Sequence, residues 1–268
     1  MSRRVAVVGA GKMGETLLSG LLRAGWPAGD LLATARRSDR REELADRYGI
    51  AVLDTGHVAA AADVLVLAVK PQDMGALLDE LGPTISSDIL IVSIAAGIPT
   101  AYLERRLPPE TAVVRVMTNT PALVDEAMTA VSAGSHAGVD HLEIAEALFR
   151  PLGKTIRVPE SQQDAVTALS GSGPAYFFYL VEAMTDAGIL LGLPRTVAHD
   201  LIVQSAIGAA IMLRDSGKHP VKLREAVTSP AGTTISAIRE LENHGVRAAM
   251  LAALEAARDR ARTLAAEA

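Results

Sequence analysis

The stretch Val5-Ala6-Val7-Val8-Gly9-Ala10-Gly11-Lys12-Met13-Gly14 decides the fold of this chain. Four apolar residues, typical of a buried strand, run directly into the pattern G-x-G-x-x-G, and the amphipathic stretch Met13–Ala24 follows. In this context Gly9 permits a tight turn, Gly11 allows a pyrophosphate to approach the backbone, and Gly14 allows a helix to pack closely on a strand. The positive end of the helix dipole would face the phosphates. The stretch therefore predicts dinucleotide binding rather than an ordinary glycine-rich turn.

The rest of the first half alternates strand and helix patterns. Continuous apolar runs of this length are typical of strands that are buried on both faces. We therefore predict an α/β fold with a doubly wound, mostly parallel sheet of the Rossmann type. The expected strands are Val5–Val8, Leu31–Thr34, Val64–Val69, Ile89–Ile94, Val113–Met117, Ala127–Ser132 and Lys154–Val158, and further expected helices are Arg40–Tyr48, Asp73–Leu81 and Asp140–Phe149.

The pattern changes after Pro159, where β-branched runs stop and helical patterns continue to the end of the chain. Ser161 and Asp164 have the spacing of a capping box that would open a helix. Two longer helices are expected at Ala175–Leu191 and Pro194–Leu213. We predict two domains: a dinucleotide-binding domain at residues 1–158, and an all-α domain at residues 159–268.

The predicted helix Ala175–Leu191 is apolar over most of its circumference, although it carries Glu182 and Asp186. A small helical domain cannot bury so much apolar surface alone. We expect burial against a second copy of the chain, and twofold symmetry is the commonest arrangement. The alternative is packing on the chain's own first domain. In the next helix we expect the apolar residues to be buried, namely Leu201, Ile202, Ala206, Ala209 and Ile211–Leu213.

Composition excludes several classes of function. The 268 residues include 26 Lys and Arg against 31 Asp and Glu, a net charge of −5, so we expect no nucleic-acid partner. Cysteine is absent from the sequence, which excludes disulfides and thiolate chemistry, and the six histidines have no metal-ligand spacing. The longest apolar run, Ile89 to Ile98, is well short of the ~20 residues of a membrane span. We expect a cytoplasmic protein with no membrane partner.

Two arginines at the end of the second predicted strand indicate the type of cofactor. A site that prefers NAD usually has an acidic residue there, which binds the ribose 2′-hydroxyl. Here the segment is Thr34-Ala35-Arg36-Arg37-Ser38, and the first carboxylate is that of Asp39. Because Arg36 and Arg37 suit a 2′-phosphate, we expect NADPH to be favoured and NADH to be used less well. The alternative is that both arginines are solvated surface charges.

Three other segments are candidates for ligand contacts, two at the ends of predicted strands and one at the start of a predicted helix. Ala68-Val69-Lys70-Pro71 and Ala95-Ala96-Gly97 follow predicted strands, and ligands bind beyond the carboxyl ends of strands. Thr228–Thr234 opens a helix, whose N-terminal N–H groups attract anions. Each segment also has an ordinary interpretation, as a proline at a helix start, as tight packing, or as helix capping.

Together these motifs resemble the pyrroline-5-carboxylate reductase family, and the resemblance runs colinearly over essentially the whole chain. Its two most specific blocks lie in the second half. The motifs that carry the resemblance are the glycine fingerprint, Ala68-Val69-Lys70-Pro71, Ala95-Ala96-Gly97, Asn119-Thr120-Pro121, Asp164-Ala165-Val166-Thr167 with Leu169-Ser170-Gly171-Ser172-Gly173-Pro174-Ala175-Tyr176, Gly192-Leu193-Pro194, and Thr228-Ser229-Pro230 through Thr234.

The resemblance implies NAD(P)H-dependent reduction of 1-pyrroline-5-carboxylate, a cyclic imine, to L-proline, the last step of proline biosynthesis. It implies a homodimer through the helical domain, which also binds substrate, and a decamer as the larger assembly. It implies substrate contacts at Glu160, Thr233 and Thr234, with the Thr234 hydroxyl as the catalytic group. The implied cofactor contacts are Gly9, Ala10, Gly11, Lys12, Met13, Gly14, Arg36, Arg37, Ala68, Val69, Lys70, Pro71, Ala95, Ala96, Gly97 and Asn119.

The sequence departs from the family pattern at Thr118, Ala231, Thr55 and Ala226. Ala231 replaces a glycine, so we expect a negative φ there and a changed turn. One alternative function is a related hydroxyacid dehydrogenase or imine reductase. A dehydrogenase of that group needs a general base, commonly Lys, on the helix Ser161–Leu169, and that segment contains none. The other alternative is a regulator that binds NADPH without turnover.

Overall fold

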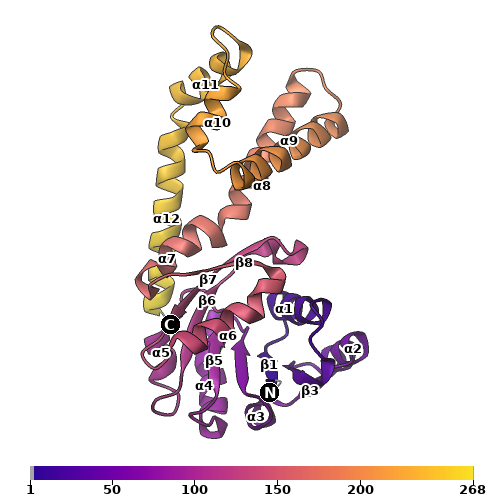
Figure 1. Cartoon of the computed structure of the whole chain (residues 1–268), viewed down its shortest axis with the longest axis vertical. Helices are drawn as coiled ribbons and strands as arrows, with labels where there is room; N and C mark the ends of the chain where they lie inside the picture. The colour runs from indigo at the N-terminus through magenta and orange to yellow at the C-terminus, as the bar shows by residue number, and fades with distance from the viewer. Residues whose placement is uncertain (1–2, 268) are drawn as a thin grey trace. The chain divides into compact units, whose positions relative to one another are not determined.

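The computed structural model describes residues 3–267, and the chain forms two compact units (Figure 1). The first unit contains the residues up to Ser172 and the segment from Ala256 onward, and the second contains Gly173–Glu255. The predicted domain boundary at 158/159 thus lies fourteen residues before the division between the units. The reason is that the segment after Pro159 packs on the sheet of the first unit. The side-chain amide of Gln163 donates a hydrogen bond to the hydroxyl of Ser132, a residue of the sheet.

A single eight-stranded sheet forms the centre of the first unit within the described residues. Its order is β3-β2-β1-β4-β5-β6-β7-β8, and every neighbouring pair is parallel except β6 with β7. The predicted fold class, a doubly wound and mostly parallel sheet, is confirmed. The strands are β1 (Val5–Val8), β2 (Leu31–Thr34), β3 (Ala51–Leu53), β4 (Val64–Leu67), β5 (Leu90–Ser93), β6 (Val113–Met117), β7 (Ala127–Ala133) and β8 (Gly153–Arg157).

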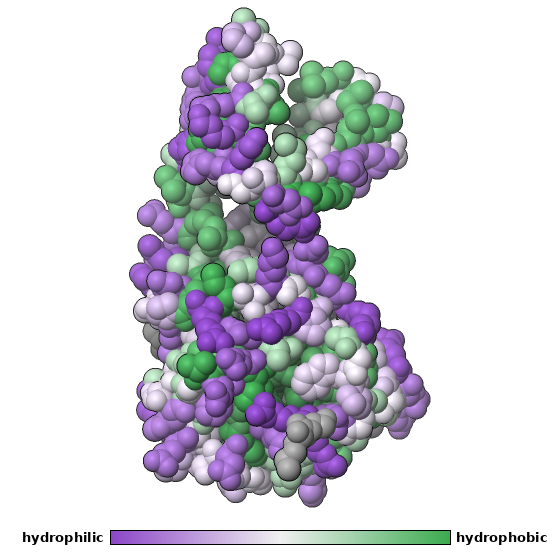
Figure 2. Space-filling view, viewed as in Figure 1, coloured by the Kyte–Doolittle hydropathy of each residue, from purple (hydrophilic) through white to green (hydrophobic). Residues whose placement is uncertain are grey.

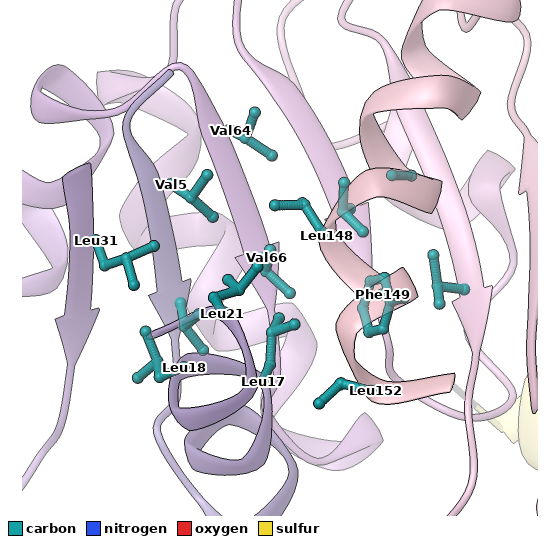
Figure 3. Packing of buried hydrophobic residues seen from close by; sticks show 14 of the residues in the cluster. Val5, Leu17, Leu18, Leu21, Leu31, Val64, Val66, Leu148, Phe149 and Leu152 are labelled. Atoms are coloured by element: carbon teal, nitrogen blue, oxygen red, sulfur yellow. The ribbon is translucent and has the colours of Figure 1, made fainter. Parts of the chain in front are cut away.

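Helices cover both faces of this sheet, which explains the continuous apolar runs of its strands. Val5 and Val7 of β1 contribute to the cluster under α1, α2 and α6, shown in part in Figure 3, while Ala6 and Val8 contribute to the cluster under α3, α4 and α5. The buried side chains of β1 therefore alternate between two cores. The helices are α1 (Lys12–Arg23), α2 (Ser38–Tyr48), α3 (Thr55–Val58), α4 (Met74–Leu81), α5 (Thr100–Glu104) and α6 (Val139–Phe149).

The second unit is helical in the part of the chain that the structure describes. Its elements are α8 (Gly173–Leu190), α9 (Arg195–Asp215), α10 (Pro220–Ala226), α11 (Thr233–Asn243) and the first part of α12 (Val246–Glu267). Close packing of α8 on α9 requires Gly188, because a Cβ there would lie 2.7 Å from the Ala198 Cβ. The predicted helices at Ala175–Leu191 and Pro194–Leu213 are thus present, each displaced by one or two residues.

Large apolar side chains are exposed on this helical unit (Figure 2). On α8, Phe177, Phe178 and Tyr179 are 67%, 68% and 71% exposed, so three consecutive positions of the helix face outward. The prediction that α9 buries its apolar residues is wrong for the single chain, since Leu201 and Met212 are more than half exposed. Within residues 3–267, α8 and α9 pack on each other but leave these apolar side chains exposed in a single copy of the chain.

α9 is the one helix in the described residues with the length and apolar composition that a membrane crossing needs. The sequence analysis did not anticipate this. Helices that are apolar all round also occur where subunits pack together, so composition alone does not separate the two cases.

Local structure overturns two smaller predictions. No capping box forms at Ser161; instead the chain continues through a 3₁₀ turn at Glu160–Gln162, α7 (Gln163–Val166) and a π-helix at Thr167–Gly171. Ala231 has a φ of 54°, so it adopts the left-handed conformation that was expected to require glycine. The turn before α11 therefore carries backbone strain at Ala231.

Candidate functional site

A cavity of about 940 Å³ opens beyond the carboxyl ends of β1, β2 and β4. This is the edge at which parallel α/β sheets bind ligands. The predicted cofactor residues that line the cavity are Gly9, Ala10, Gly11, Arg36, Arg37, Ala68, Val69 and Lys70. Thr55, at the start of α3, lines the cavity as well.

The three fingerprint glycines occupy distinct environments. Gly9 has a φ of 90°, and a Cβ there would lie 2.7 Å from Val69 Cγ1. A Cβ on Gly14 would lie 2.8 Å from the Gly9 carbonyl oxygen and 2.9 Å from Val7 Cγ1, which shows how closely α1 packs on the sheet. A Cβ on Gly11 would meet no atom within 4 Å, so the space beside this backbone is open.

The loop of glycines is tied to the end of β2. The Gly9 N–H donates to the Thr34 hydroxyl at 3.1 Å, and the Ala10 N–H donates to the Thr34 carbonyl at 3.1 Å. Lys12 and Met13 begin α1, whose first N–H groups have no intrahelical acceptor and point toward the N-terminal end. The open space at Gly11 and these donors together form an anion cradle of the size and kind that a pyrophosphate requires.

Four arginines line the cavity, and the sequence analysis identified two of them. Arg36 and Arg37 are largely solvent-exposed, with 87% and 74% of their side chains accessible. Arg40 and Arg41, on α2, were missed. The signal that could have found them is their position in the first turn of the helix that directly follows Arg37.

Glu15 fixes Arg40 in the cavity wall. Its carboxylate accepts hydrogen bonds from Arg40, from Arg47 at 2.9 Å and from the Tyr48 hydroxyl at 2.8 Å. Burial alone would raise the pKa of Glu15, but the hydrogen bonds from Arg40 and Tyr48 hold that pKa below its usual value. Glu15 thus stays ionised and connects α1 to α2.

The other predicted cofactor positions lie outside the lining of this cavity. Ala95 is buried and donates its N–H to the Ser93 hydroxyl at 3.4 Å, and Gly97 has a φ of 77° in the following turn. The Asn119 amide is engaged within the first unit: its Nδ2 donates to the Ser170 carbonyl at 3.1 Å, and its Oδ1 accepts from the Met128 N–H at 3.1 Å. Lys12, Met13, Gly14, Pro71 and Ala96 also fall outside the lining.

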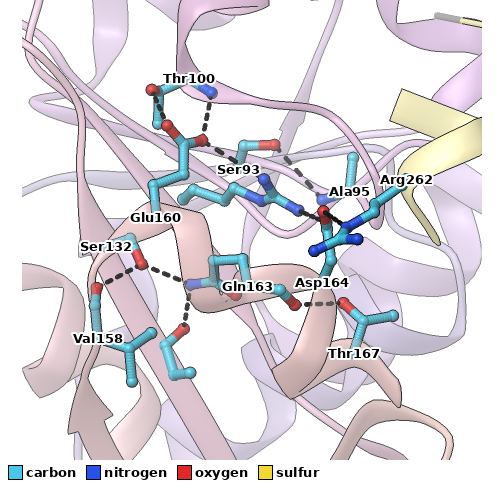
Figure 4. A network of polar contacts seen from close by, with 12 residues as sticks. Ser93, Ala95, Thr100, Ser132, Val158, Glu160, Gln163, Asp164, Thr167 and Arg262 are labelled. Atoms are coloured by element: carbon cyan, nitrogen blue, oxygen red, sulfur yellow. Dashed lines mark hydrogen bonds and ion pairs between the residues drawn. The ribbon is translucent and has the colours of Figure 1, made fainter. Parts of the chain in front are cut away.

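Glu160 is held at the start of α5 (Figure 4). Its carboxylate accepts hydrogen bonds from both the N–H and the hydroxyl of Thr100, each at 2.7 Å. The buried guanidinium of Arg115 on β6 lies 3.4 Å from Glu160 and 3.3 Å from Asp164. Arg262 of α12 lies 3.9 Å from Asp164. These contacts join sequence-distant parts of the first unit around one buried cation, and the sequence contained no local signal for them.

Thr233 and Thr234, the other predicted substrate contacts, begin α11 in the second unit. The N-cap residue is Gly232, which has no side chain that could accept a hydrogen bond from the first turn. The Ser236 hydroxyl donates back to the Gly232 carbonyl at 3.1 Å. The N–H groups at this helix start are therefore not occupied by a capping side chain.

The fold and the cavity together define a protein of the Rossmann type with a dinucleotide site, and the chain adds a second, helical unit. Two family models match on the two sides of residue 158. The model described as NADP oxidoreductase coenzyme F420-dependent matches residues 4–97, and the model described as pyrroline-5-carboxylate reductase dimerisation matches residues 160–264.

Relatives and solved structures match the chain along nearly its whole length. The pyrroline-5-carboxylate reductase of Corynebacterium melassecola is 44% identical, over 97% of this chain and 98% of the relative. The structure of the Coxiella burnetii reductase has a TM-score of 0.92 at 35% identity, covering 98% and 99% of the two chains. The Plasmodium falciparum enzyme, solved with NADP bound, has a TM-score of 0.88 at 26% identity, covering 98% of each. The chain belongs to the pyrroline-5-carboxylate reductase family.

Family membership confirms the predicted resemblance and accounts for the helical unit as a dimerisation region. The alternatives weighed from the sequence, a hydroxyacid dehydrogenase and a regulator without turnover, are not favoured by these matches.

Proposed function

We propose that this chain reduces 1-pyrroline-5-carboxylate to L-proline with NADPH. The observation that carries the proposal is the near full-length match to reductases of this name, at up to 44% identity. The cavity at the sheet edge supports it, because its glycine loop and cationic wall suit a dinucleotide with an additional phosphate.

NADPH would supply a hydride to the electrophilic C=N carbon of the substrate. The chain's own residues bind and orient the reactants. Arg36 and Arg37 hold the 2′-phosphate, and the Gly9–Gly14 backbone with the start of α1 holds the pyrophosphate. The remaining cofactor contacts are assigned to Ala68, Val69, Lys70, Pro71, Ala95, Ala96, Gly97 and Asn119.

Thr233 and Thr234 are assigned to the substrate. Their backbone N–H groups hold the substrate carboxylate at the positive end of α11, and the Thr234 hydroxyl bonds the ring nitrogen as the imine becomes an amine. Glu160 contributes a further substrate contact through carboxylate lone pairs beyond those that Thr100 uses. A site of this kind needs no histidine base, since protonation of the imine supplies the electrophile.

The chain divides functionally at 158/159. Residues 1–158 bind the dinucleotide, and residues 159–268 form the dimer and bind the substrate. The family matches at 4–97 and 160–264 support this division. The chain forms a homo-oligomer and acts on a small molecule; we propose a decamer built from dimers. We also propose a cytoplasmic location without a membrane partner, which the biosynthetic reductases among the relatives support. The net charge of −5 argues against a nucleic-acid partner.

The test is NADPH oxidation by the purified protein with 1-pyrroline-5-carboxylate and, separately, with the six-membered-ring imine acid. We expect oxidation that depends on substrate and is faster with the five-membered ring. Absence of oxidation with both imines contradicts the proposal.

Substitution of Thr234 tests the assignment of the catalytic hydroxyl. Thr234→Ala should lower kcat/KM about 100-fold, the effect of losing a hydrogen bond to a charged group, while Thr234→Ser retains most activity. Ser236→Ala is the matched control, because it removes a hydroxyl from the same helical turn. If Thr234→Ala lowers only the Tm, the residue acts as a helix cap.

A further inference from the structure

The four arginines of the cavity wall differ in how they are held. Arg40 is fixed by Glu15 and by Glu43, at 2.6 Å, and only a fifth of its side chain is exposed. Arg41 donates to the Ala35 carbonyl at 2.6 Å and to Asp54 at 2.5 Å. These two guanidiniums are therefore committed to contacts that build the wall.

Arg36 has a different kind of partner. Its Nη2 lies 3.1 Å from Oδ2 of Asp73, in the 3₁₀ turn Pro71–Asp73 after β4. Both residues line the cavity, so this ion pair crosses it from the end of β2 to the end of β4. The acidic partners of the other three arginines, Asp39, Glu15 with Glu43, and Asp54, are not among the lining residues.

The Arg36–Asp73 pair is accessible to water and therefore weak. The side chains are 87% and 36% exposed, and ion pairs at such positions contribute little to stability. A phosphate dianion offers Arg36 a stronger, charge-assisted contact than a single carboxylate does. A 2′-phosphate bound at Arg36 either shares the guanidinium with Asp73 or replaces it, and in both cases the neighbouring carboxylate repels the phosphate.

We propose that Asp73 is a specificity-determining residue that competes with the 2′-phosphate of NADPH for Arg36. It thereby lowers the preference for NADPH over NADH below the value that the arginines alone would give. NADH has no 2′-phosphate, so its affinity does not depend on this competition. The inference rests on the proposed use of NADPH and identifies the residue that limits it.

The experiment measures Kd by calorimetry for NADPH, NADH and 2′,5′-ADP, using the full-length wild-type chain and Asp73→Asn. We expect Asp73→Asn to tighten binding of NADPH and 2′,5′-ADP about fivefold, the upper range for an exposed ion pair, and to leave NADH unchanged. The gain should shrink at high salt, because exposed charges are screened.

Two further variants separate this competition from a general change of charge. Asp54→Asn removes the acidic partner of a neighbouring cavity arginine, but Asp54 lies outside the lining and Arg41 keeps its bond to Ala35. It should give no gain. In an Arg36→Ala background, Asp73→Asn should lose most of its gain, because the two residues are coupled.

The possible results distinguish a failure of the competition at Arg36 from a failure of the NADPH site itself. The inference is overturned if Asp73→Asn leaves NADPH affinity unchanged, weakens it, tightens NADH equally, or keeps its full gain without Arg36. If the wild-type chain does not bind 2′,5′-ADP, the proposed NADPH site itself fails. If the wild type binds it and Asp73→Asn gives no gain, only the competition fails.

Discussion

The two units of this chain differ in how completely each buries its own apolar side chains. In the first unit, two clusters occupy the two faces of the sheet, and Leu17, Leu65 and Phe149 have no accessible surface. In the second unit, Phe178 and Leu190 are 68% and 88% exposed. The first unit thus buries two large clusters within a single chain and has its own ligand cavity, whereas the helical unit leaves an apolar surface that a partner can bury.

A charge placed on the exposed face of α8 should have the largest effect, because it should prevent a second copy from covering the helical unit. Phe178→Asp places a carboxylate where a second copy would pack, so we expect monomers and at least a 100-fold loss of activity, because burying an unpaired charge is costly. Binding of 2′,5′-ADP to the first unit should persist. Light scattering and calorimetry measure the two properties.

Leu123→Asp is the matched control for this substitution. Leu123 is 69% exposed, nearly the same as Phe178, but it belongs to the first unit. The oligomer should survive this change. If both variants dissociate, or if neither does, the distinction between the two units is wrong.

Two glycine substitutions distinguish close packing from cofactor binding in the first unit. Gly14→Ala would place a Cβ 2.8 Å from the Gly9 carbonyl oxygen. It should therefore both lower the Tm and displace the glycine loop. Gly11→Ala meets no protein atom within 4 Å and should leave the Tm unchanged while weakening NADPH binding at least about tenfold. Thermal unfolding and NADPH titration distinguish them. A loss of Tm in Gly11→Ala would contradict the assignment of the open space to the cofactor.

Glu146 tests the stability that the first unit supplies internally. Arg157 of β8 donates to its carboxylate at 2.7 and 3.0 Å, and these hydrogen bonds hold the pKa of Glu146 below its ordinary 4.5. The stabilisation is complete above pH 4.5 and is lost as the pH falls through the lowered pKa. Glu146→Gln should cost about 2 kcal/mol at pH 7, and progressively less in acid. A constant difference across pH would contradict this pairing.

The smallest expected effect concerns strain within the second unit. Ala231 has a φ of 54°, and a left-handed conformation costs a residue with a Cβ about 1 kcal/mol. Ala231→Gly should therefore raise the Tm by about 2–4 °C without changing the oligomer. A lower Tm would show that the greater freedom of glycine in the unfolded chain outweighs the relieved strain.

The sequence predicted the features that depend on local pattern. Continuous apolar runs identified five strands, and two more were expected at Ala127–Ser132 and Lys154–Val158, where β7 and β8 lie. β3 was missed because it has only three residues, of which one is exposed and two are partly buried. The fingerprint placed Gly9, Gly11 and Gly14 in the environments that the structure has. Contacts that depend on tertiary packing were not predictable from local pattern: α1 presents Glu15 to Arg40, and Glu160 accepts hydrogen bonds from Thr100, sixty residues away in the sequence.

The exposed apolar side chains of the helical unit show a second feature that sequence patterns do not settle, namely what buries an apolar helix. The sequence analysis expected the apolar positions of α9 to be buried and the neighbouring helix α8 to be covered by a second copy of the chain, with packing on the chain's own first domain as the alternative. Whether an apolar helix is covered by its own chain or by a second copy depends on the fold around it, which periodicity does not contain. The family match to a dimerisation region supplies the missing partner.

The central claim is tested most directly by following the transferred hydrogen. The purified chain is incubated with 1-pyrroline-5-carboxylate and NADPH that carries deuterium at both hydrogen positions of nicotinamide C4, and the proline formed is analysed by mass spectrometry. The account predicts proline that carries one deuterium at C5, in amounts equal to the NADPH consumed. Unlabelled proline, or consumption of NADPH without proline, would contradict it.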